Sequence, residues 1–143
     1  MNGAQKSGEL HLLVRAGADL CALPVHRIRR IVRELPVSPL PGAAPELRGL
    51  AEFGGEPMPV LDLVRLVGAA PGANPTYPLI VVGWAGPDER RELVGFAVDA
   101  VLEVANVLAE AIVPAAGGWF RGDVSLGGRA VRVLDPEELG ARP

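Results

Sequence analysis

The sequence predicts a mainly β protein built from two copies of one unit, each folding as a small closed barrel of short strands with brief helical turns. The pattern Arg-Gly, four residues, Gly-Gly, four residues, Val-Leu-Asp occurs at residues 48–62 and again at residues 121–135. The offset is 121 − 48 = 73 in a chain of 143 residues. Two copies are too few for a stacked repeat array, so each is expected to fold as a unit and to pack against the other.

Short apolar runs broken by glycine and proline are the second observation, and they favour many short strands over long helices. Residues 10–16 and 20–25 are two such runs, and residues 17–19 between them predict a hairpin turn. Residues 25–33 combine helical spacing of apolar residues with β-branched side chains. We therefore expect one helical turn that runs into a strand.

A second hairpin is predicted after a proline-rich loop. Prolines at 36, 39, 41 and 45 break the chain, and residues 47–53 and 57–63 then flank Gly54-Gly55. Glycine adopts positive φ without strain, so this pair is expected to form the turn. Residues 67–75 are a low-complexity stretch and predict a linker between the copies.

The second copy is expected to repeat this arrangement. We predict strands at 77–85, 92–101, 120–126 and 129–134, with a turn at 86–89 and a less regular piece that ends at Pro114. Barrel closure would protect the strand edges from pairing with other chains.

The predicted subdomains follow the repeat. The first spans about residues 14–67, the linker about 68–76 and the second about 77–135. The N-terminal strand and the C-terminal segment are candidates for exchange between the two subdomains.

Composition excludes several classes of function. A net charge of −3 and only 4% aromatic residues weigh against nucleic-acid binding. No apolar run approaches the roughly 20 residues of a membrane span. Cys21 is the single cysteine, so no disulfide within the chain is possible, and a reducing, cytoplasmic setting is expected.

No metal or cofactor site is predicted. His11, Cys21 and His26 are the only soft metal ligands, and no pair of them has the short spacing of a zinc site. We expect the side chain of His11 to point to solvent and that of Cys21 to pack as a small hydrophobe.

The acidic and basic residues favour structural roles over catalytic ones. Asp62 and Asp135 follow equivalent strands, where aspartate caps the free N–H groups of a helical turn. A small hydrolytic enzyme using Asp62, Asp99 or Asp135 is a remote alternative, because no activated nucleophile accompanies them. An arginine cluster at positions 27, 29, 30 and 33 is either a solvated face or a contact surface for an acidic partner.

Several motifs, in this order and spacing, resemble the CheW-like domain family over nearly the whole chain. In the first half they are Leu23-Pro24-Val25 through Ile28, Pro39-Leu40-Pro41-Gly42, Leu47-Arg48-Gly49 and residues 55–63. In the second half they are residues 94–101, Arg121-Gly122, Gly128-Arg129 and Val133-Leu134-Asp135.

The resemblance implies two SH3-like, five-stranded barrels that share a core. It also implies a non-enzymatic adaptor that joins the cytoplasmic signalling tip of a chemoreceptor, a methyl-accepting chemotaxis protein, to the regulatory domain of a CheA-type histidine kinase. By position, the receptor-binding groove would be lined by Leu12, Val25, Ile28 and Val101. The alternative for each of these four is an ordinary place in the core.

Two departures from the family pattern bear on partner choice. The family commonly carries an acidic residue where this chain has Arg30, and an Asn-Leu-Arg-Gly run where it has Glu52-Phe53-Gly54-Gly55. Interface charges tune partner choice, so Arg30, Glu52 and Gly54 are candidate partner-specificity residues, and Glu52 is a candidate ionic partner for Arg30. An accessory protein that binds receptor but not kinase is the alternative within the family.

Overall fold

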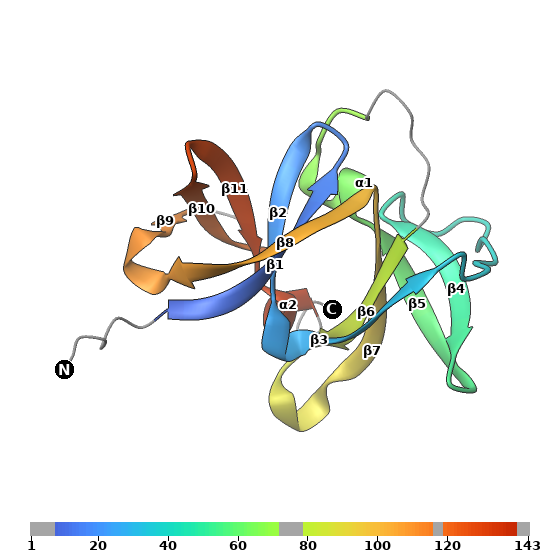
Figure 1. Ribbon diagram of the computed structural model, residues 1–143. Coiled ribbons are helices and arrows are strands. Elements are labelled where there is room, and N and C mark those ends of the chain that lie inside the picture. The colour runs from blue at the N-terminus through green and yellow to red at the C-terminus, as the bar shows by residue number, and fades with distance from the viewer. Residues whose placement is uncertain (1–7, 72–78, 116–118, 140–143) are drawn as a thin grey trace.

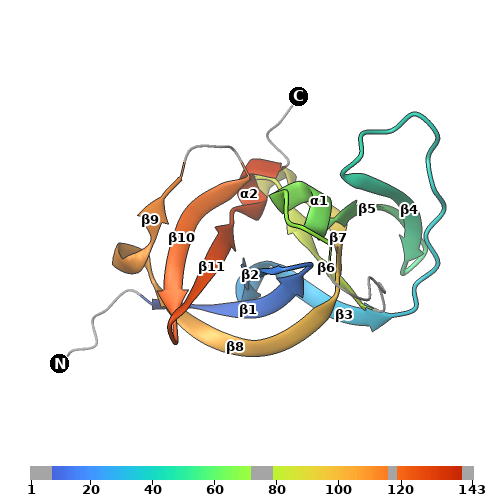
Figure 2. The ribbon, with the colours of Figure 1, turned by 90° about the horizontal axis from the view of Figure 1, so that it is seen from above.

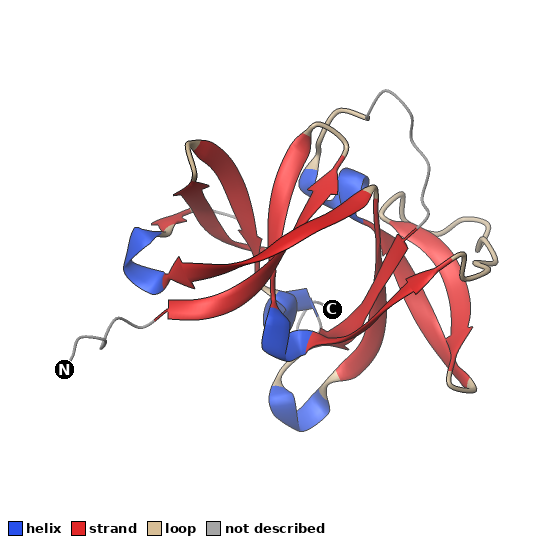
Figure 3. Cartoon of the chain, in the orientation of Figure 1, coloured by secondary structure: helices blue, strands red, loops and turns tan. Residues whose placement is uncertain are grey.

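The computed structural model describes residues 8–71, 79–115 and 119–139, and strands dominate it (Figures 1 and 3). They form two sheets. The six-stranded first sheet has the order β8-β1-β2-β11-β10-β9, with β8 (Ala100–Leu108), β1 (Gly8–Ala16), β2 (Asp19–Pro24), β11 (Arg129–Leu134), β10 (Phe120–Leu126) and β9 (Val113–Pro114). The five-stranded second sheet has the order β3-β6-β7-β5-β4, with β3 (Ile28–Arg33), β6 (Leu79–Ala85), β7 (Glu92–Val98), β5 (Glu56–Asp62) and β4 (Leu47–Phe53).

The helices are short, as the glycine and proline content predicts. Five-residue α1 (Leu63–Val67) begins at Asp62, whose carboxylate accepts hydrogen bonds from the N–H groups of Val64 and Arg65. The predicted capping role of Asp62 is therefore confirmed. The remaining helical elements are η2 (Val25–Arg27), η3 (Asp88–Arg90), η4 (Ala109–Ala111) and α2 (Pro136–Leu139).

Most predicted elements are present. The hairpins β1–β2 and β4–β5 turn at the expected glycines, and η2 runs directly into β3. The expectation of an irregular segment before Pro114 is wrong, because residues 100–108 form the regular strand β8 along β1. A register shift opposite Leu13 and Val14 interrupts the alternation of β8, which hid the strand from pattern reasoning. Part of the predicted linker lies outside the described residues.

Parallel pairs join segments that are far apart in the chain. Strand β5 pairs with β7, and β11 pairs with β2, both in parallel, whereas the other pairings are antiparallel. Each sheet therefore combines strands from both halves of the sequence. The predicted subdomain boundaries remain a prediction.

The main apolar cluster lies between the two sheets, and α1 is part of it (Figure 2). Strand β1 contributes Leu12 and Val14 to this cluster and turns Leu13 to a second cluster inside the first sheet. Strand β6 likewise contributes Val81 here and turns Val82 to a cluster inside the second sheet. Both faces of these strands are buried, which explains their continuous apolar sequences.

The predicted closed barrels are not seen. Hydrogen bonding in each sheet runs from one edge strand to the other, and no pairing in the described segments joins the two ends. The count of five strands holds only for the second sheet. In the first sheet β9 adds a sixth strand, whereas the second sheet has only an isolated bridge between Ser38 and Leu50 at the comparable edge.

Candidate functional site

The four predicted groove residues belong to, or pack against, one apolar cluster between the sheets. Leu12 on β1 is buried within it. Half-buried Val25 on η2, Ile28 on β3 and Val101 on β8 pack against it. The structure thus brings together residues from both sheets, and each of the last three retains some exposed apolar surface.

Two exposed residues extend this surface beyond the predicted set. Leu10 and Val104 are each 53% exposed. Val104 lies directly opposite Leu12 in the β1–β8 register, and Leu10 is two residues from Leu12, so all three share one face of the sheet. The alternation of Leu10 and Leu12 in the sequence could have identified this face. We call Leu10, Leu12, Val25, Ile28, Val101 and Val104 the inter-sheet groove, after the groove that the family resemblance predicts at this position.

The chemistry of the inter-sheet groove is that of an apolar docking surface. Its six side chains carry no charge and no nucleophile, and its exposed members lie at the edge strand β8 and the adjacent β1. Such a strip suits the apolar face of a partner helix, whose residues at positions i, i+3 and i+4 would replace solvent there.

The three predicted specificity residues belong to the second sheet. Arg30 lies on β3, Glu52 on β4 and Gly54 in the β4–β5 turn, and all three are exposed. Strands β3 and β4 are the two edges of this sheet, and the structure records no ion pair between Arg30 and Glu52. Gly54 has φ of 61°, a left-handed conformation that favours glycine for a local structural reason.

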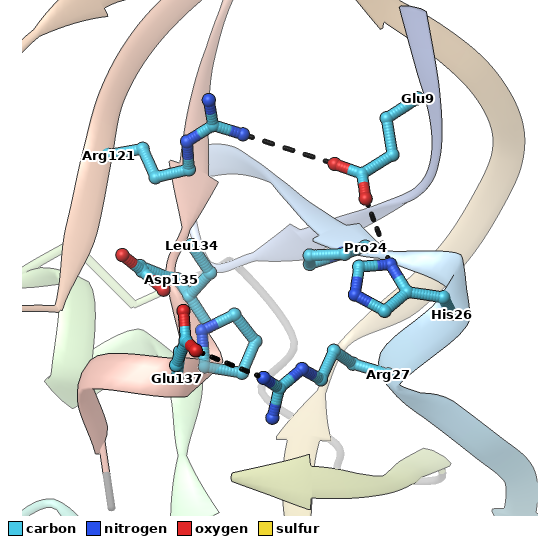
Figure 4. Close-up of a pocket in the computed structure, with 9 residues that line it drawn as sticks. Glu9, Pro24, His26, Arg27, Arg121, Leu134, Asp135 and Glu137 are labelled. Atoms are coloured by element: carbon cyan, nitrogen blue, oxygen red, sulfur yellow. Dashed lines mark ion pairs between the residues drawn. The ribbon is translucent and has the colours of Figure 1, made fainter. Parts of the chain in front are cut away.

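A pocket lined by charged side chains lies where β1, η2, β10 and α2 meet (Figure 4). Glu9 is 2.9 Å from His26 and 3.9 Å from Arg121, so one carboxylate links β1 to both η2 and β10. Across the pocket, Arg27 faces Glu137 at 3.8 Å. These pairs tie segments together at the junction of the sheets.

Arg27 is only 8% exposed, which corrects the expectation of a uniformly solvated arginine cluster. Its guanidinium donates hydrogen bonds to the carbonyl oxygens of Gly86, at 2.6 Å, and Trp84, at 3.5 Å. Asp88 lies 3.3 Å away. The alternating pattern could not show this, because Arg27 is held in the 3-10 turn η2 that precedes β3.

The candidate catalytic aspartates have separate surroundings. Asp62 caps α1 and lies 3.5 Å from Arg48. Asp99 accepts a hydrogen bond from the N–H of Gly17 at 2.6 Å. Asp135 lines the charged pocket. Two of the three thus bind backbone N–H groups, as structural carboxylates do.

His11 is completely buried, so the expectation that it points to solvent is wrong. It alternates with Leu12 and therefore shares the face of Leu13, inside the first sheet, where its Nδ1 lies 3.0 Å from the carbonyl oxygen of Glu9. Within the described residues, no group of three or more histidine, cysteine, aspartate or glutamate side chains could hold a metal ion.

Cys21 packs as a small hydrophobe, as predicted. It is fully buried in the cluster between the sheets. Burial, with a smaller contribution from Asp19, raises the pKa of its thiol to about 12. A neutral, enclosed thiol of this kind is a poor nucleophile.

Comparison with known proteins agrees with this arrangement of strands. The profile of the CheW-like domain matches residues 10–142. The chain belongs to the CheW-like domain family. No curated protein sequence matches this CheW-like chain at a significant level.

Several solved structures resemble the CheW-like chain, and one of them does so over most of its length. It is the crystal structure of the scaffolding protein TtCheW from Thermoanaerobacter tengcongensis, with a TM-score of 0.74 and 16% sequence identity. The match covers 90% of this chain and 89% of that chain. At this identity the likeness concerns the fold alone.

Among the described residues, none of the helices has the length and apolar character that crossing a membrane requires.

Proposed function

We propose that this protein is a non-enzymatic, cytoplasmic adaptor that couples the signalling tip of a chemoreceptor to the regulatory domain of a CheA-type histidine kinase. Membership of the CheW-like domain family carries the proposal. The inter-sheet groove supports it, because its exposed apolar side chains suit a receptor's helical hairpin. Nucleic acid and direct insertion into a membrane are not part of this function.

A paired calorimetric titration tests the proposal. The purified protein is titrated with a cognate receptor signalling fragment and, separately, with the regulatory domain of the cognate kinase. We expect binding to both. Binding to neither would contradict an adaptor role of any kind.

An accessory protein that binds receptor but not kinase is the second candidate. It rests on the expected departure at Gly54, which lies in the β4–β5 turn, although this chain carries a Leu-Arg-Gly run at residues 47–49 on β4. The same titration separates the candidates. Kinase binding by the wild-type protein would exclude the accessory role, whereas receptor binding alone would establish it.

An internal duplication of one structural unit belongs to the same proposal. Its support is local: Gly49 and Gly122 both follow a register shift in their hairpins and have φ of 151° and 152°. A Cβ at Gly49 would collide with the carbonyl oxygen of Ser38, and one at Gly122 with that of Val113. Equivalent backbone contacts at an offset of 73 residues are what two copies of one unit would preserve.

A further inference from the structure

Two arginines and two aromatic rings from four segments meet at one end of the second sheet. The guanidinium carbon of Arg29 lies 5.4 Å from the ring centroid of Phe53 and 5.8 Å from that of Trp84. Arg91, which directly precedes β7, lies 4.5 Å from the Trp84 centroid. We call Arg29, Phe53, Trp84 and Arg91 the arginine–aromatic cluster.

The two rings hold the cations in place. Phe53 and Trp84 are half-buried and pack against the apolar cluster inside the second sheet, whereas Arg29 and Arg91 are exposed. A guanidinium over an aromatic face keeps its N–H edge available for hydrogen bonds to a carboxylate. Since stacking already restricts these side chains, they lose less conformational freedom when a partner binds.

Neither cation is neutralised within the described residues. No carboxylate there lies within 4 Å of Arg29 or Arg91, although the chain has 17 acidic against 14 basic residues. The contrast is with arginines that do have carboxylate partners, namely Arg27, Arg48, Arg121, Arg129 and Arg132. Both guanidiniums in the arginine–aromatic cluster are therefore able to pair with the carboxylates of another molecule.

The approach to the cluster is open beside Phe53. A Cβ placed on Gly54 would meet nothing within 4 Å, so the hairpin tip next to the ring is unobstructed. Exposed Glu52 directly precedes Phe53, exposed Glu56 lies opposite Phe53 in the β4–β5 register, and exposed Glu92 follows Arg91. These acids confine the positive charge to the positions of Arg29 and Arg91, which favours two separate carboxylates on a peptide over the continuous charge of nucleic acid or an anionic membrane.

We infer that the arginine–aromatic cluster is a docking surface for an acidic peptide segment of a partner protein, with Arg29 and Arg91 each binding a carboxylate and Trp84 lying between them. This surface is separate from the inter-sheet groove. It does not depend on the coupling role proposed above.

Fluorescence of Trp84 provides the test. The protein has two tryptophans, so Trp119→Phe leaves Trp84 as the sole reporter. This protein is titrated with a synthetic peptide of alternating Glu and Ala, and with the same peptide in which Gln replaces Glu. We expect the acidic peptide alone to change the Trp84 emission, with an affinity that falls as salt is added.

Substitutions identify the residues responsible. We expect Arg29→Gln and Arg91→Gln each to weaken peptide binding by about fivefold or more, measured by anisotropy of a labelled peptide so that Trp84 emission is not required. Arg33→Gln is the matched control, because Arg33 is an exposed arginine on the same strand, β3, with no aromatic contact recorded. Val104→Arg, in the inter-sheet groove, is expected to leave peptide affinity unchanged, which separates this test from that of the coupling role.

Three results would overturn the inference. The first is that the acidic peptide does not bind. The second is that Arg33→Gln weakens binding as much as Arg29→Gln in proteins with wild-type circular dichroism spectra. The third is that a single-stranded oligonucleotide binds through Arg29 and Arg91 as tightly as the peptide does, which would make the cluster a general anion patch.

Discussion

At the scale of single residues, buried polar groups contribute more to the stability of the fold than exposed charges do. Arg27 donates to the carbonyl oxygens of Trp84 and Gly86 at the end of β6 and pairs with the Glu137 carboxylate at the start of α2, so one side chain joins η2 to two other elements. Its acidic neighbours Asp88 and Glu137 are mostly exposed, so they contribute less than the carbonyl hydrogen bonds. Cys21, by contrast, contributes only apolar packing.

Removal of Arg27 is expected to destabilise the fold. We predict that Arg27→Ala lowers the free energy of unfolding by about 2 kcal/mol, because the buried carbonyl of Gly86 loses its donor. Urea denaturation measures the change. Arg129→Ala is the control, since its exposed ion pair with Glu103 at 3.3 Å is expected to contribute less than about 1 kcal/mol. Equal losses in the two variants would contradict a special role for Arg27.

Burial of the Cys21 thiol makes the stability of the fold depend on pH in the alkaline range. The folded protein raises the pKa of this thiol from its ordinary 9.0 to about 12, so above pH 9.0 the unfolded chain releases a proton that the folded chain retains. Stability from this group is complete below pH 9.0 and is lost as pH rises toward 12. We expect the wild type to lose more stability than Cys21→Ala in urea denaturation between pH 8 and pH 10.5. Parallel curves for the two proteins would show that the thiol does not contribute.

At the scale of elements, close backbone contacts fix the two glycine hairpins. In β4–β5 and in β10–β11, a glycine lies against the carbonyl of the segment that borders the hairpin. The sequence predicts these hairpins because the glycine pairs at their tips are local signals. It could not predict the parallel pairings β5–β7 and β11–β2, because no local pattern encodes a contact across so many residues.

Gly122→Ala and Gly128→Ala separate close packing from turn conformation. Both glycines have positive φ, but a Cβ at Gly128 meets nothing within 4 Å, whereas one at Gly122 collides with the carbonyl oxygen of Val113. We predict losses of about 1 kcal/mol for Gly128→Ala and at least about 3 kcal/mol for Gly122→Ala, measured by urea denaturation. Similar losses would mean that conformation alone requires glycine at Gly122.

At the scale of the whole molecule, pattern reasoning predicted the mainly β architecture, which the structure shows without closed barrels, and four residues of the proposed groove. Hairpins, turns and the four central groove residues follow from local apolar runs and from the family resemblance. Leu10 and Val104 were missed because their exposure depends on the pairing of β1 with β8, a strand whose register shift obscured its alternation. Burial of His11 was missed because both faces of β1 are covered, which a single strand's sequence does not reveal.

The inter-sheet groove is proposed here as the surface through which this CheW-like protein binds a chemoreceptor. The most direct measurement is calorimetric titration of a cognate receptor signalling fragment with the wild type, Val104→Arg and Val113→Arg. Both valines are exposed, Val104 in the groove and Val113, at 68% exposure, on β9 at the opposite edge of the sheet. We predict that Val104→Arg weakens binding about tenfold or more and that Val113→Arg does not. Receptor binding that is unchanged by Val104→Arg would show that the inter-sheet groove is not the receptor-binding surface.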